Sequence, residues 1–165
     1  RIAKVRFWVT QSRDQARYYQ HSELGFNYRM SNIVAGIGRG QLKVLDKRVA
    51  KKRYIYGFYK RELGSLKGVE MMPVNNWNKP NCWLSCMTLN NSKVGPLDII
   101  EALEKENIES RPIWKPMHIQ PFFMNYDFIG EGLSEKIFKR GVCLPSDTKL
   151  TDEDLYRICE IIKKL

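Results

Sequence analysis

Long hydrophobic runs are missing from this chain of 165 residues, and so are the compact motifs of several enzyme classes. No stretch approaches the roughly 18 consecutive apolar residues of a membrane-spanning helix. Residues 1–10 mix charged and apolar side chains and do not match a secretory signal. Neither the G-x-S-x-G turn of serine hydrolases nor the H-E-x-x-H helix of zinc proteases occurs. We therefore expect no membrane partner and neither of these two hydrolase chemistries.

Cysteine and histidine are also scarce, with four of the first and two of the second. Cys82 and Cys86 are spaced like half of a zinc site, but no second Cys or His pair lies near them. We therefore predict no metal site and no disulfide framework. Buried, reduced thiols in a cytoplasmic protein are the expectation.

Acidic residues are few in the first part of the chain. Residues 1–68 carry 16 Lys and Arg against 4 Asp and Glu, whereas residues 69–165 carry 12 against 14. The net charge of +10 allows a basic anion- or nucleic-acid-binding module without catalysis. No nucleic-acid motif is present, and the aromatic residues are not interleaved with the basic ones as stacking platforms. This module remains the alternative to an enzyme.

Periodic apolar residues predict a long helix over residues 31–64, after a short helix at 2–10 and an irregular loop at 11–29. Ser31 is a suitable N-cap and Gly64 a suitable stop. Some thirty residues at 1.5 Å each would give a helix about 45 Å long. We expect such a helix to be a long spine that extends along more than one folded unit.

The rest of the chain predicts an α+β fold, in which a small, mainly antiparallel sheet is backed by helices. Pro112, Pro116 and Pro121 predict a rigid, non-helical loop over residues 112–121. The predicted strands cover 82–90, 108–114 and 142–144, and the predicted helices 96–107, 134–140 and 151–163. Pro96 is expected at the first position of its helix, and Thr151 to Asp154 are expected to form a capping-box variant. An extended piece is expected within 65–81.

Two polar segments could carry chemistry. Asn27, Arg29 and Ser31 place an amide, a guanidinium and a hydroxyl at a predicted helix N-terminus, where anions are favoured. The alternative is that Ser31 only caps the helix and Arg29 is solvated. Within the proline-rich loop, His118 is either a ligand-binding group near neutral pH or an incidental surface histidine.

Three glycines, Gly36, Gly38 and Gly40, fall inside the predicted long helix. Their spacing fits neither the dinucleotide fingerprint nor the P-loop. Because each glycine costs about 1 kcal/mol in a helix interior, we expect close packing against another backbone as the compensation, rather than phosphate binding.

Taken in order, these segments resemble the DegT/DnrJ/EryC1/StrS family of pyridoxal phosphate-dependent sugar aminotransferases. The runs GFNYRMSNI (25–33), AGIG (35–38) and QL (41–42) are similar to its G-x-N-x-R-[ML]-[ST]…A-x-x-G-x-x-Q-L motif. RPIWKPMHIQP (111–121) and GVCLPS (141–146) resemble its later landmarks, and 151–165 its closing helix. Gly36 and Gly40 depart from the family, which more often has Ala or a larger residue there.

The resemblance implies part of a fold type I, aspartate aminotransferase-like enzyme. Residues 1–64 would link to an absent large domain, which carries the Schiff-base lysine, and residues 65–165 would form the C-terminal small domain. No catalytic residue is then expected in this chain, and it should be inactive alone. The start at Arg1 rather than Met agrees with a processed or truncated product.

The resemblance also implies roles for single residues. Asn27 would hydrogen-bond the phosphate of pyridoxal 5′-phosphate in the neighbouring subunit of a homodimer, and Arg29 would lie near substrate at the same boundary. His118 would line the nucleotide-sugar pocket, with Trp114 and Lys115 as neighbours. The implied reaction moves an amino group from glutamate to a nucleotide-linked keto sugar, in cell-surface or secondary-metabolite sugar biosynthesis in the cytoplasm.

Overall fold

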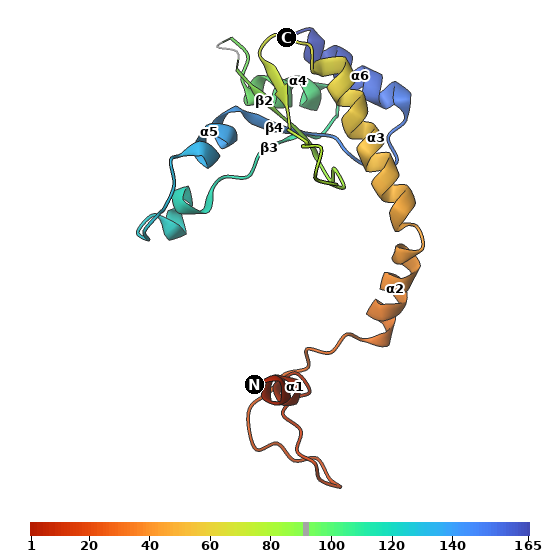
Figure 1. Ribbon diagram of the computed structural model, residues 1–165, viewed down its shortest axis with the longest axis vertical. Coiled ribbons are helices and arrows are strands. Elements are labelled where there is room, and N and C mark those ends of the chain that lie inside the picture. The colour runs from red at the N-terminus through yellow and green to blue at the C-terminus, as the bar shows by residue number, and fades with distance from the viewer. Residues whose placement is uncertain (91–92) are drawn as a thin grey trace. The chain divides into compact units, whose positions relative to one another are not determined.

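The computed structural model describes residues 1–90 and 93–165 (Figure 1). Its contacts divide the chain into two compact units, Arg1–Leu45 and Asp46–Leu165, which are described separately below. The division precedes residue 64 because most of the preceding helix packs into the core of the C-terminal unit. The assignment of residues 1–64 as a link to a further domain remains a prediction.

The N-terminal unit contains α1 (Ile2–Trp8), a long loop and α2 (Asn32–Leu42). The loop has more order than expected, because isolated bridges join Thr10 to Asn27 and Arg13 to His21. Neither helix has a buried residue. This unit is therefore held mainly by backbone hydrogen bonds rather than by an apolar core.

The single long helix predicted over residues 31–64 is wrong: α2 ends at Leu42, and α3 (Leu45–Leu63) follows a turn in which the Val44 N–H bonds the Gln41 carbonyl. The apolar stripe continues in sequence, but it is buried only in α3. The expected packing at the three glycines of α2 is also absent within the described chain, since a Cβ at any of them would meet nothing within 4 Å.

The C-terminal unit is built on a four-stranded antiparallel sheet of order β1-β2-β4-β3, which confirms the predicted α+β class. Its strands are β1 (Val69–Met71), β2 (Ser85–Leu89), β3 (Arg111–Pro112) and β4 (Gly141–Leu144). The predicted strand over 108–114 shrinks to two residues, because proline lacks the amide N–H that a ladder needs.

Helices α3, α4 (Pro96–Lys105) and α6 (Asp152–Lys163) supply the core against one face of the sheet (Figure 1). Along β2, residues 85, 87 and 89 are buried and 86 and 88 are half-buried, as expected when one face meets the core. Local end signals are confirmed: Pro96 begins α4, and Thr151 and Asp154 form a capping box on α6.

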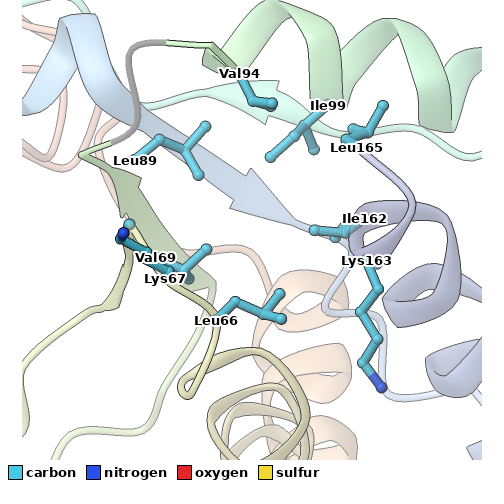
Figure 2. Close-up of a pocket in the computed structure, with 10 residues that line it drawn as sticks. Leu66, Lys67, Val69, Leu89, Val94, Ile99, Ile162, Lys163 and Leu165 are labelled. Carbon is cyan, nitrogen blue, oxygen red and sulfur yellow. The ribbon is translucent and has the colours of Figure 1, made fainter.

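A small apolar cavity of about 180 Å³ lies beside this core (Figure 2). Leu89, Ile99 and Ile162 line it, and Lys163 lies at its edge. None of the residues singled out from the sequence lines this cavity, so it is a packing feature of the fold.

The other face of the sheet is covered by α5 (Leu133–Arg140) and by the segment after β3. That segment was predicted to be non-helical, but it contains two short 3-10 turns, η1 (Met117–Ile119) and η2 (Pro121–Phe123). A 3-10 turn needs few hydrogen bonds and tolerates proline at its start. Within the described residues, no helix is both long and apolar enough to cross a membrane.

Candidate functional site

The backbone at Asn27 is held by the end of α1. Asn27 bridges Thr10, and the flanking amides of Phe26 and Tyr28 donate to the carbonyls of Trp8 and Val9 at 3.2 and 3.1 Å. Three successive residues are thus anchored on the last residue of α1 and the two residues after it. Because α1 has no buried residue, its clearest structural role is to position the backbone at Asn27.

Gly25 is required where the two sides of this loop meet. A Cβ at Gly25 would lie 2.2 Å from Ser12 Oγ and 2.5 Å from the Ser12 amide nitrogen. Ser12 is fully buried, and with Gln11 it adopts a positive φ that L-residues seldom occupy. Only glycine allows this approach, and the approach brings the chain back to Asn27.

The side chains of Asn27 and Ser31 each accept a hydrogen bond from the backbone that follows them. Asn27 Oδ1 accepts from the Arg29 amide at 3.0 Å, and Ser31 Oγ accepts from the Val34 amide at 3.3 Å as the N-cap of α2. In the described chain, the side-chain nitrogen of Asn27 (Nδ2) and the guanidinium of Arg29 have no hydrogen-bond partner. The Ser31 cap is therefore confirmed. The unpaired side-chain N–H groups of Asn27 and Arg29 are compatible both with a bound anion and with solvation, so the anion site stays a prediction.

Trp114 and Lys115 lie on the wall of an open cavity of about 680 Å³ beside β3 and β4. Trp83, which precedes β2, is the second indole of this wall, and its ring centroid lies 5.9 Å from that of Trp114. Both indoles are more than half exposed. The same wall carries Lys115 and Arg111, and Arg111 is ion-paired with Glu109, which also lines the cavity. The cavity thus offers stacking faces and a lysine without a carboxylate partner on that wall.

His118 belongs to a different contact group. Its Nε2 lies 2.9 Å from Glu135 Oε1 on α5, and its ring stacks on Phe128 with centroids 3.7 Å apart. The His118 side chain is only 16% exposed. The incidental surface histidine is therefore excluded: His118 is held by a carboxylate and an aromatic ring, and its Nδ1 is the nitrogen left for a further contact.

The structure thus brings Trp114 and Lys115 together, places His118 in a second group of the same unit, and holds Asn27 and Arg29 in the other unit. Sequence reasoning missed Trp83, Phe128 and Glu135. The spacing of Glu135 and His118, 17 residues apart across irregular chain, carries no periodic signal. Among the described residues, no three His, Cys, Asp or Glu side chains are grouped to hold a metal ion.

Comparisons with known proteins identify the family of the chain. Residues 2–163 match the DegT/DnrJ/EryC1/StrS aminotransferase family. EpsN of Bacillus subtilis, named as a pyridoxal phosphate-dependent aminotransferase, is 47% identical over 99% of this chain and 43% of its own length. GDP-perosamine synthase of Caulobacter vibrioides is 32% identical over 94% of this chain and 43% of its own length.

Solved structures show the same fold. The aminotransferase TlmJ of Streptoalloteichus hindustanus has a TM-score of 0.84 at 16% identity, over 98% of this chain and 43% of that chain. PseC of Helicobacter pylori, an aminotransferase involved in pseudoaminic acid biosynthesis, has a TM-score of 0.83 at 18% identity. The match covers 98% of this chain and 45% of that chain. The chain therefore spans less than half the length of the relatives it matches. It belongs to the DegT/DnrJ/EryC1/StrS aminotransferase family.

Proposed function

We propose that this chain is the C-terminal part of a pyridoxal phosphate-dependent enzyme that transfers an amino group from glutamate to a nucleotide-linked keto sugar. The observation that carries the proposal is the anchored Asn27 loop, whose free donors suit a phosphate, in a chain matched to the family over residues 2–163. The names of relatives support the substrate class, since one makes GDP-perosamine and another acts in pseudoaminic acid biosynthesis.

The residues around Asn27 fit the phosphate end of the cofactor. An amide N–H, a guanidinium and a hydroxyl next to the N-terminus of the eleven-residue α2 form a donor set without a carboxylate. When bound, pyridoxal phosphate supplies the electron sink for amino transfer. Asn27 would bind its phosphate, and Arg29 would hold an anionic group of the substrate beside it.

The cavity at Trp114 suits the substrate's nucleotide. An indole face can stack on a base or sugar, and Lys115 and Arg111 can neutralise a diphosphate. His118, fixed by Glu135, would donate to or accept from a sugar hydroxyl through Nδ1. These roles orient the substrate and exclude water, whereas the covalent lysine would be supplied from outside this chain.

A homodimer would complete the site. Asn27 and Arg29 are exposed on the N-terminal unit, so they are available to a site shared with a second subunit. Ile33, Val34 and Ile37 on α2 are more than half exposed, as expected for a helix that meets another chain. With glutamate and nucleotide sugars as substrates, we expect the reaction in the cytoplasm.

The experiment is an amino-transfer assay of the full-length protein with glutamate and a panel of nucleotide-linked keto sugars, read as 2-oxoglutarate formed. We expect Trp114→Ala to raise the KM for the sugar nucleotide roughly tenfold, since one base-stacking contact contributes about 1–3 kcal/mol. The KM for glutamate should not change. Trp77→Ala, which alters an exposed indole outside the cavity, is the matched control.

Two results would contradict the proposal. One is the absence of 2-oxoglutarate with every keto sugar, combined with tight, salt-sensitive binding to nucleic acid, which favours the basic binding module. The other is visible absorbance of a lysine-bound cofactor in the 165-residue chain alone, since we expect the isolated chain to be inactive.

A further inference from the structure

Two cysteines face each other across the centre of the sheet. Cys86 on β2 and Cys143 on β4 are direct partners in the antiparallel register, and their Sγ atoms lie 3.6 Å apart. Directly opposed residues have Cα atoms about 4.5–5.5 Å apart. Disulfides span about 4.4–6.8 Å between Cα atoms, so the backbone already suits a bond and only side-chain torsions would change.

The pair lies on the face of the sheet away from the helical core. Ser85 and Met87 point into the core, so Cys86 between them points outward, and Cys143 shares its face through the register. Cys143 lines the 680 Å³ cavity of Trp114, and Cys86 lines a neighbouring open cavity of about 370 Å³. Cys86 is half-buried and Cys143 is buried, at 6% exposed, so the direct route for a small solute to the pair is from the side of Cys86.

The two thiols have unequal acidities. The hydrogen bond between them lowers the pKa of the Cys143 thiol, against the effect of its burial. The same hydrogen bond, together with burial, raises the pKa of the Cys86 thiol. Either sulfur could donate in this hydrogen bond. Because its pKa is the lowered one, Cys143 is the thiol of the pair that loses its proton more readily, and the thiolate is the form of cysteine that attacks oxidants.

We propose that Cys86 and Cys143 form a reversible disulfide when the protein meets a hydroperoxide. The Cys143 thiolate attacks one peroxide oxygen, the O–O bond breaks, and the leaving oxygen takes a proton to become water or an alcohol. Cys86 then loses its proton and attacks the sulfenic sulfur of Cys143, and the S–O bond breaks to release water. Two thiols and one hydroperoxide thus give one disulfide, and the peroxide is reduced by two electrons.

The other two cysteines lack this arrangement and provide the controls. Cys82 and Cys159 are buried, and neither is hydrogen-bonded to a second thiol in the described part of the chain. Burial raises the pKa of the Cys82 thiol and raises that of Cys159 to about 12. Cys143 is buried as well, so the difference lies in the raised pKa of these two thiols and in their lack of a thiol partner, and we expect both to react slowly.

The test treats the 165-residue chain with hydrogen peroxide, blocks the remaining thiols with a maleimide after unfolding, and maps the peptides by mass spectrometry. We expect a peptide pair linked through Cys86 and Cys143, with loss of these two thiols roughly tenfold faster than loss of Cys82 and Cys159. Dithiothreitol should restore all four thiols. Cys143→Ser should abolish the linked pair, whereas Cys159→Ser should retain it.

Three results would overturn the proposal. In the first, Cys86 and Cys143 react with maleimide after oxidation as fully as they do in the untreated protein. In the second, the linkage joins two chains, visible as a dimer on a non-reducing gel. In the third, Cys82 or Cys159 is oxidised as fast as Cys143. Because the wild-type chain gives the decisive map, a variant that fails to fold does not affect the outcome. The result is independent of the proposed aminotransferase activity.

Discussion

Replacing Ser146 with Ala should destabilise the C-terminal unit, because this one hydroxyl joins two strands at the wall of the Trp114 cavity. Ser146 Oγ accepts from the Ser85 amide at 3.0 Å and donates to the Leu144 carbonyl at 2.9 Å. Ser85 is fully buried and Ser146 is 6% exposed, so water cannot replace the lost partner.

The expected size of the effect follows from what is left unpaired. A buried N–H without a partner costs about 1–3 kcal/mol, and the methyl group of Ala restores none of it. With a urea dependence of about 2 kcal/mol per molar, the unfolding midpoint should fall by about 0.5–1.5 M. The amide of Ser85 should also lose its protection from hydrogen exchange.

Urea unfolding followed by far-UV circular dichroism measures the first quantity, and hydrogen exchange of the peptide containing Ser85 measures the second. Ser65→Ala is the matched control, since Ser65 is exposed. The reasoning is refuted if Ser146→Ala shifts the midpoint no more than Ser65→Ala, or if Ser85 remains protected.

Three further changes test other parts of the structure. Gly25→Ala should speed hydrogen exchange in the 24–28 peptide roughly tenfold, because its methyl would overlap the facing turn; Gly36→Ala, with open space around it, should not. Glu135→Ala should raise the rate at which diethyl pyrocarbonate modifies His118 severalfold, with the chain's other histidine unchanged. Hydrogen bonds from Thr151 in the capping box lower the pKa of Asp154 in the folded chain. The ionised Asp154 therefore stabilises the fold fully above the ordinary carboxyl pKa near 3.9. This stabilisation is lost as the pH falls through the lowered pKa of the folded state. Asp154→Asn should therefore flatten the fall in urea midpoint between about pH 5 and pH 2.

Local signals in the sequence predicted local structure well. The caps at Ser31 and Thr151 and the proline that begins α4 act through neighbours three or four residues away, so a single stretch of sequence contains all that decides them. The apolar, β-compatible residues of 82–90 predicted a strand, although it starts at Ser85 rather than at residue 82. Cys82 lies outside the strand because it has a positive φ.

Long-range structure was predicted less well. The helical spacing of apolar residues over 31–64 does not show which unit each helical turn packs against. The break between α2 and α3 was therefore not predicted. Pairings such as that of His118 with Glu135, or Trp83 with Trp114, depend on how loops close after the sheet has formed. The spacing of the motif around Asn27 identifies it in the sequence. The need for glycine at position 25 comes from its close approach to Ser12, which no local pattern shows.

The most direct test of the proposed function is the amino-transfer rate of the full-length protein measured over a range of pyridoxal phosphate concentrations. If Asn27 binds the cofactor phosphate, Asn27→Ala removes a hydrogen bond to a charged group worth about 1.5–3 kcal/mol. The cofactor concentration for half-maximal rate should then rise by about ten- to 150-fold, whereas Asn76→Ala on an exposed loop should match the wild type. An unchanged cofactor requirement in Asn27→Ala would contradict the account.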